Sequence, residues 1–222
     1  MEISKYEAVL FDMDGTLLDS EGFYYKAWTS VLDDYGLEVD LELWMNSLVG
    51  KTDEQAFAFL QEKHGFDIDG VEFHARKDER MAALALTEHV PLMPGAEQLL
   101  TYLQERSITL ALVTSSSRAG ATHHLSNHGL LDAFSVIVTR DDVQYPKPHP
   151  EPYQRCVQQL AMAKDQCVVL EDSATGAASA KAAGLTCFGV QSHAGIRQDL
   201  AVDRIFDNLN QVLLFLKQGV TI

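Results

Sequence analysis

Two aspartates, separated by one residue, close a short apolar run near the start of the chain. Asp12-Met13-Asp14-Gly15-Thr16 directly follows Ala8-Val9-Leu10-Phe11. In an extended chain Asp12 and Asp14 project to the same side, and Gly15 lets the backbone turn away. Crowded carboxylates are costly unless a cation neutralises them, and oxygen ligands favour magnesium. The alternative, in which Asp-Gly only makes a turn, does not explain two acids at the end of a buried strand.

A second apolar run ends in hydroxyl side chains. Leu110 to Val113 is followed by Thr114-Ser115-Ser116-Ser117. A hydroxyl at the end of a strand, together with the next backbone N–H groups, can hold phosphate oxygens, and Thr114 is the candidate for that role. A helix N-cap explains one of these serines equally well, so the signal is weak by itself.

One lysine lies between prolines. Lys147 is flanked by Pro146 and Pro148, which restrict the backbone on both sides. A lysine held in this way is a fixed positive charge for a phosphate or a carboxylate. The alternative is a solvated lysine in a rigid connector. The nearby His149 is interpreted as structural.

A third apolar run ends in two acids. Cys167-Val168-Val169-Leu170 leads into Glu171-Asp172-Ser173. Successive strand residues face opposite ways, so at most one acid would reach a site unless the chain bends, and we rank Asp172 above Glu171. Ser173 is a candidate N-cap. Simple capping of the following helix by acids is the alternative interpretation.

Elements of two kinds must position these residues. Short apolar runs alternate with helical patterns, and this alternation predicts an α/β fold, a Rossmann-like doubly wound parallel sheet. The expected strands are Ala8 to Phe11, Ile108 to Val113, Val136 to Val138, Val168 to Leu170 and Cys187 to Val190. From Ser20 to Val90 only helical patterns occur. We therefore expect a core made of residues 1–19 and 91–222 and an inserted helical cap of residues 20–90, carried over the strand ends where open α/β proteins bind ligands.

Composition limits the partners. The 222 residues include 32 acidic and 17 basic ones, a formal charge of −15, so we expect neither nucleic acid nor an anionic membrane as a partner. Cys156, Cys167 and Cys187 form no CxxC pair, which favours a reducing compartment. Neither a signal peptide nor an apolar stretch of membrane-spanning length is evident, so we expect a cytoplasmic protein, and a monomer.

The four signals in order resemble the haloacid-dehalogenase superfamily of phosphotransferases. The motifs are similar in sequence to those of its β-phosphoglucomutase and sugar-phosphatase branch, whose members carry a helical cap. These motifs are Asp12-Met13-Asp14-Gly15-Thr16, Lys147-Pro148 and Glu171-Asp172-Ser173. The resemblance runs from Ala8 to about Val190. It implies a magnesium-dependent phosphatase of small phosphorylated metabolites, sugar phosphates first among them.

The resemblance also implies a role for each matching residue. Asp12 would attack phosphorus and become an aspartyl phosphate, while Asp14 would act as acid and base. Lys147 would offset negative charge. Thr114, Ser115 and Ser116 would hold the substrate phosphate. Magnesium would be held by the Asp12 carboxylate, the Asp14 carbonyl, Asp172 and Glu171. In the cap, Gly50-Lys51-Thr52-Asp53 is the counterpart of a specificity loop, and we expect Gly50 and Lys51 to face the substrate. The alternative for Lys51 is an ordinary surface lysine.

Other functions share some of these motifs. A phosphosugar mutase has the same core, but the mutases of this branch carry a cap histidine and a loop arginine where this chain has Tyr24 and Asp53, which favours a phosphatase. A dehalogenase of this superfamily lacks the second aspartate, present here as Asp14. A phospho-aspartate receiver domain also combines strand-end acids with a Lys-Pro pair, but it has no helical cap of this size.

Overall fold

The computed structural model describes residues 6–49, 51, 53–85 and 87–218. Gly50, expected in the specificity loop, lies outside these residues. The chain divides into two compact units, one formed by Met1–Asp19 with Pro91–Ile222 and the other by Ser20–Val90. Each unit is described by itself, the first as the core unit and the second as the helical unit.

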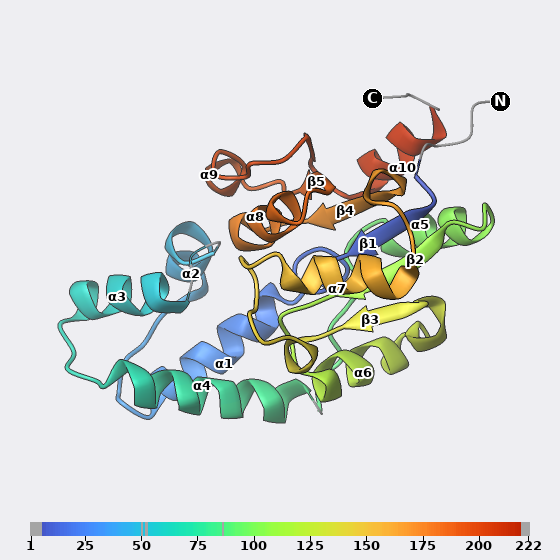
Figure 1. The fold of residues 1–222 in the computed structure, drawn as a ribbon. Helices are drawn as coiled ribbons and strands as arrows, with labels where there is room; N and C mark the ends of the chain where they lie inside the picture. Colours follow the sequence, from blue (N-terminus) through green and yellow to red (C-terminus); the bar gives the residue numbers. More distant parts are fainter. Residues whose placement is uncertain (1–5, 50, 52, 86, 219–222) are drawn as a thin grey trace. The chain divides into compact units, whose positions relative to one another are not determined.

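The described part of the core unit contains a six-stranded parallel sheet with the order β3-β2-β1-β4-β5-β6 (Figure 1). The strands are β1 Ala8–Phe11, β2 Thr109–Val113, β3 Val136–Val138, β4 Cys167–Glu171, β5 Thr186–Val190 and β6 Arg204–Phe206. The predicted doubly wound parallel fold is confirmed. The chain moves from β1 to one side through β2 and β3 and then returns to the other side at β4, so the topological switch lies at the carboxyl end of β1, where such sheets bind ligands.

Burial explains why the central strands read as continuous apolar runs. All four residues of β1 and all five of β4 are buried. One face, which includes Leu10, packs against the helix residues Tyr153 and Ala180. On the other face, the Phe188 ring lies 5.8 Å from the Phe215 ring. Helices therefore cover the sheet on both faces, as a parallel sheet requires.

The helices of the core unit begin at polar caps or after turns. Ser117 and Ser173 are N-caps whose hydroxyls accept hydrogen bonds from the backbone N–H of Gly120 and Gly176. The α-helices are α5 Ala96–Gln104, α6 Arg118–Asn127, α7 Glu151–Leu160, α8 Ala174–Ala182, α9 Ala194–Arg197 and α10 Leu209–Lys217, and the short 3₁₀ segments are Leu131–Ala133, Arg140–Asp142 and Lys164–Gln166.

The helical unit has its own aromatic core. Its helices are α1 Glu21–Asp33, α2 Leu41–Ser47, α3 Asp53–His64 and α4 Gly70–Ala85. The Phe73 ring of α4 lies 5.0 Å from the Trp28 ring of α1 and 5.0 Å from the Phe57 ring of α3. These rings lie at the centre of the buried apolar cluster of this unit. Helix α2 was not expected from the sequence. Across the described residues of the chain, no helix combines the length and apolar character needed to cross a membrane.

The two ends of the helical insertion meet at the core unit. Leu18 and Leu92 form an antiparallel bridge. The backbone N–H of Asp19 donates to the Pro91 carbonyl at 2.8 Å, and that of Met93 donates to the Leu17 carbonyl at 2.9 Å. The outgoing and returning segments are therefore joined as a short ladder.

Candidate active site

Asp12 and Lys147 form a buried ion pair at the carboxyl end of β1. The Asp12 N–H donates to the Leu170 carbonyl at 3.0 Å, which extends the pairing of β1 with β4 past the strand end. Lys147 Nζ donates to Asp12 Oδ1 at 2.6 Å, to Glu171 Oε1 at 2.6 Å and to the Val113 carbonyl at 2.9 Å. Its side chain is only 4% exposed. The alternative of a solvated connector lysine is therefore wrong.

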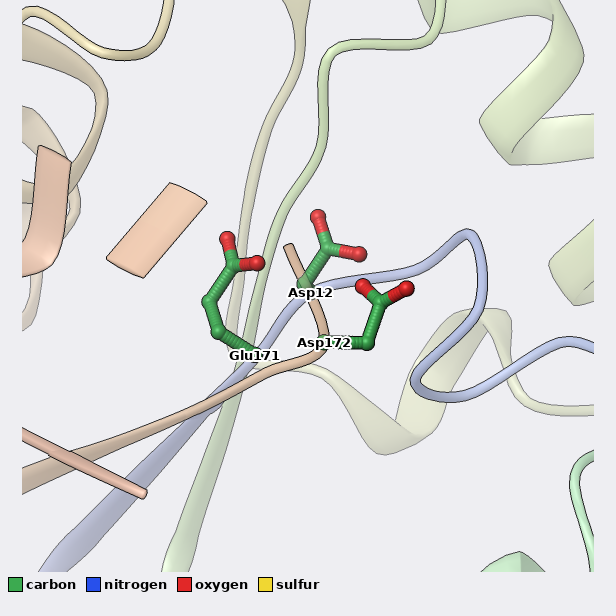
Figure 2. A group of neighbouring side chains, drawn as sticks. All are labelled: Asp12, Glu171 and Asp172. Atoms are coloured by element: carbon green, nitrogen blue, oxygen red, sulfur yellow. The ribbon is translucent and has the colours of Figure 1, made fainter. Parts of the chain in front are cut away.

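The carboxyl groups of Asp12, Glu171 and Asp172 point toward one another (Figure 2). One oxygen from each of Asp12, Glu171 and Asp172 lies within 4.8 Å of the others. Both acids of the Glu-Asp pair reach the same place because β4 ends at Glu171, so Asp172 no longer follows the strand alternation. The Thr16 hydroxyl donates to Asp172 Oδ1 at 3.3 Å. The chain therefore bends after Glu171, which is the condition under which both acids can reach one site.

The electrostatics of this cluster favour a bound cation. Burial raises the pKa of the Asp12 carboxyl well above its usual range. Lys147 lowers this pKa, but the neighbouring carboxylates raise it again. Burial and then Glu171 raise the pKa of Asp172 to about 8. Burial alone lowers the pKa of Lys147, but Asp12 and Glu171 raise it overall, so this lysine stays charged. One ammonium cannot balance three carboxylates, and a hard divalent cation with oxygen ligands fits the remaining charge.

The second aspartate of the motif has different partners. Ser116 Oγ donates to Asp14 Oδ2 at 2.7 Å, and the Thr114 hydroxyl lies 3.5 Å from the same oxygen. The Ser116 N–H donates to the Thr114 hydroxyl at 2.9 Å. Thr114 is buried, whereas Ser115 is exposed. The structure thus brings Asp14, Thr114 and Ser116 together at the ends of β1 and β2.

Two glycines allow the acids to lie against the backbone. Gly15 has a φ of 80°, and a Cβ added there would meet Asp172 Oδ2 at 2.2 Å. A Cβ added to Gly176 in α8 would meet Glu171 Oε1 at 1.9 Å. Any side chain at either position would displace a carboxylate of the cluster.

The candidates of the helical unit are placed only within that unit. Lys51 is exposed, and its Nζ lies 5.9 Å from the centre of the Phe59 ring. Asp53 begins α3 and pairs with Lys77, a buried lysine whose Nζ also lies 2.9 Å from Asp78.

Tyr153 of α7 contacts the site, although no motif in the sequence points to it. Its hydroxyl donates to Glu171 Oε1 at 2.7 Å, with both residues fully buried. The sequence places Tyr153 only at the start of a helical pattern. Its contact depends on how α7 packs on the sheet, and no local motif encodes that packing.

This arrangement of strand-end acids, hydroxyls and a buried lysine has counterparts in known proteins. A family model described as haloacid dehalogenase-like hydrolase matches residues 9–190. The chain belongs to this family. This membership confirms the family predicted from the sequence. It also shows that the chain is an enzyme, so the alternative of a phospho-aspartate receiver domain is wrong.

Relatives within the haloacid dehalogenase-like hydrolases include sugar-phosphate phosphatases. The chain is 33% identical to the fructose-1-phosphate phosphatase YqaB of Escherichia coli over 84% of its length and 97% of the relative's. It is 32% identical to the validoxylamine A 7'-phosphate phosphatase of Streptomyces hygroscopicus subsp. limoneus, over 93% of this chain and 96% of the other. The crystal structure of a HAD family hydrolase from Deinococcus radiodurans, with bound phosphate and sodium, is similar with a TM-score of 0.77 and 31% identity, over 97% of this chain and 96% of that one.

Proposed function

We propose that this protein is a magnesium-dependent phosphatase of small phosphorylated metabolites, sugar phosphates in particular, which acts through an aspartyl phosphate on Asp12. The observation that carries the proposal is the buried cluster in which Lys147 Nζ lies 2.6 Å from Asp12 and the Glu171 and Asp172 carboxylates lie close by. Phosphoryl transfer requires a positioned nucleophile and neutralised charge. Lys147 holds the Asp12 carboxylate in place, and the clustered carboxylates are suited to bind the cation that the remaining charge requires.

The first half of the reaction uses Asp12 and Asp14. Lys147 holds one oxygen of the Asp12 carboxylate, which leaves the other to attack phosphorus. The new bond joins Asp12 to phosphorus, and the bond from phosphorus to the alcohol oxygen of the substrate breaks. Asp14 gives a proton to that leaving oxygen. Ser116 fixes the direction of the Asp14 carboxyl through their 2.7 Å hydrogen bond.

The second half restores the enzyme. Asp14 takes a proton from a water molecule, which attacks the phosphorus of the aspartyl phosphate, and the Asp12 carboxylate and inorganic phosphate leave as separate groups. Asp12, Asp172, Glu171 and the Asp14 carbonyl are the groups that would hold magnesium, and the bound ion supplies positive charge for the phosphate oxygens. Thr114 and the Ser115 N–H are proposed to hold the phosphate.

Two observations support a phosphatase over a phosphosugar mutase. A mutase must grip a second phosphate, and Arg118 would be one candidate for that grip. The Arg118 guanidinium instead donates to the Ile137 carbonyl at 2.9 Å and pairs with Asp142. In the helical unit, Asp53 neutralises Lys77. Both cations are already engaged by groups of the protein itself.

The test is a panel of phosphorylated metabolites with purified protein, measured by release of inorganic phosphate. We expect hydrolysis of several hexose and polyol phosphates with added magnesium. Asp12→Asn should abolish turnover and leave the fold intact, because the amide is nearly isosteric but is not a nucleophile. More than a small residual activity in a clean preparation of this variant, whose thermal melt matches wild type, contradicts the role of Asp12.

A further inference from the structure

We infer that Tyr153 is a positioning residue for the proposed reaction: its hydroxyl fixes the Glu171 carboxylate and, through it, the Lys147 ammonium beside Asp12. The inference rests on the proposed phosphatase function. Tyr153 lies in α7, six residues after Lys147, with no exposed surface. Its ring belongs to the buried cluster that packs on one face of the sheet, together with Leu10 and Val169.

The contact between Tyr153 and Glu171 is a strong one. The Tyr153 hydroxyl donates to Glu171 Oε1 at 2.7 Å, and neither residue has any exposed surface. A buried hydrogen bond to a charged acceptor is shorter and stronger than one between neutral groups. Water does not replace the hydroxyl at a site this deeply buried, so its removal would leave Glu171 with one donor fewer.

Glu171 is restrained on its other sides as well. Its Oε1 also accepts from Lys147 at 2.6 Å, and its Oε2 accepts from the Ser173 hydroxyl at 3.2 Å. The backbone of Gly176 lies directly against the carboxylate. Within this enclosure Tyr153 sets which way Oε1 points, and that oxygen is the one that binds the ammonium.

The same tyrosine also contacts Lys147. The Lys147 Nζ lies 5.0 Å from the centre of the Tyr153 ring, a cation–π distance. The ring and the hydroxyl therefore act on two members of one chain of contacts, from Glu171 to Lys147 to Asp12. The hydroxyl orders this chain without adding charge, whereas another acid would increase the repulsion and another lysine would compete with a metal ion.

Tyr153 has no exposed surface, so it is expected to affect the rate of the chemical step and not the binding of substrate. Loss of its hydroxyl would lower kcat, because Asp12 and Lys147 would spend less time in the attacking geometry. It would leave KM nearly unchanged. It would also weaken magnesium binding, because Glu171 would be less well ordered.

The experiment compares Tyr153→Phe with Tyr102→Phe. The first variant keeps the ring over Lys147 and removes only the hydroxyl. The second is a matched control, because the Tyr102 hydroxyl donates to the Leu216 carbonyl at 3.4 Å, away from the acids.

We expect kcat with p-nitrophenyl phosphate to fall about tenfold in Tyr153→Phe, with KM changed by less than about twofold. Calorimetric titration without substrate should show magnesium binding weakened severalfold. Tyr102→Phe should match wild type in all three quantities.

Each outcome decides the inference. Equal kcat and magnesium affinity in the two variants overturns it, and so does a rise in KM at unchanged kcat, which would place Tyr153 in substrate binding. If wild type hydrolyses no phosphorylated compound, the proposed function fails, and the magnesium titration then tests Tyr153 alone: weaker binding in Tyr153→Phe supports the inference and equal binding overturns it. Absence of magnesium binding by wild type contradicts both.

Discussion

Gly176 has no Cβ atom, and this leaves space for the Glu171 carboxylate of the candidate site. It is the third residue of α8, and its N–H donates to the Ser173 hydroxyl. A Cβ there would lie 1.9 Å from Glu171 Oε1, well inside the closest approach of real Cβ atoms. The glycine is needed for the space that the carboxylate occupies.

Gly176→Ala should therefore inactivate the enzyme while leaving it folded. The methyl group must push Glu171 away by more than 1 Å, and a displacement of that size lowers kcat roughly 100-fold. Circular dichroism should still show a folded protein. The measurement is kcat on the best substrate of the panel.

Gly120→Ala is the matched control for this change. Gly120 is also the third residue of its helix and also donates to its N-cap serine. Its added Cβ would meet only the Ser117 hydroxyl, at an ordinary 3.4 Å. This variant should keep full activity and gain about 0.5–1 kcal/mol of stability, because alanine favours the helix. Equal activity of the two alanine variants would contradict the crowding argument.

At the scale of elements, Asp142 ties the end of β3 to the start of α6. It accepts from the Thr139 N–H and hydroxyl, both at 2.7 Å, and pairs with Arg118. Although burial raises the pKa of the Asp142 carboxyl, the hydrogen bonds from Thr139 and the charge of Arg118 lower it overall. This link holds the hydroxyl-bearing end of β2 beside β3.

Asp142→Asn should lower the free energy of unfolding by about 1 kcal/mol at pH 7, a modest figure because the pair is partly solvated. The folded-state pKa lies below the unfolded value of about 3.9, so this stability is present above that pH and is lost as the pH falls through the folded pKa. Urea unfolding of both proteins should show the difference shrinking below about pH 4. Asp132→Asn, at an exposed position, should change nothing, and a difference that persists undiminished in acid would contradict the charge argument.

The sequence predicted the elements that are continuous and buried. Ala8–Phe11 and Ala96–Gln104 occur with the expected bounds because a parallel strand and an amphipathic helix carry clear periodicities. Strand β6, Arg204–Phe206, was missed because a three-residue edge strand with an exposed arginine carries no such signal.

Side-chain geometry was less predictable. That Glu171 and Asp172 both reach the cluster depends on where pairing with β5 stops, and Glu171 is the last paired residue. The contact of Tyr153 with Glu171 depends on packing between residues 18 positions apart. Such contacts follow from tertiary structure, which local patterns do not specify.

At the scale of the whole molecule, charge balance predicts dependence on a metal. The chain carries a formal charge of −15, and within its candidate site the buried carboxylates outnumber their one ammonium partner. A phosphate dianion would be repelled from this site unless a cation were bound.

Activity should therefore require magnesium, disappear with EDTA and be blocked by calcium, whose larger coordination shell misplaces the attacking carboxylate. Asp172→Ala should raise the magnesium concentration needed for half-maximal rate steeply, whereas Asp132→Ala should not. Turnover at full rate by dialysed enzyme in excess chelator would contradict the proposed metal site.

Two basic side chains that already form ion pairs within the protein predict hydrolysis rather than isomerisation. Supplied with β-glucose 1-phosphate and a trace of the 1,6-bisphosphate, the enzyme should release phosphate at least as fast as it forms glucose 6-phosphate, because Arg118 and Lys77 are paired with Asp142 and Asp53. The two products are followed separately. Isomerisation that greatly outpaces phosphate release would establish a mutase instead.

The ladder formed by Leu17 to Asp19 and Pro91 to Met93 has a consequence for how such genes evolve. The chain leaves the core unit and returns to it at neighbouring backbone positions, held by the Leu18–Leu92 bridge. A coding segment for residues 20–90 can therefore be lengthened, shortened or exchanged as a cassette without altering the path of the sheet. The inserted segment can therefore change in sequence and length while the segments that form the sheet and its carboxylate cluster are retained.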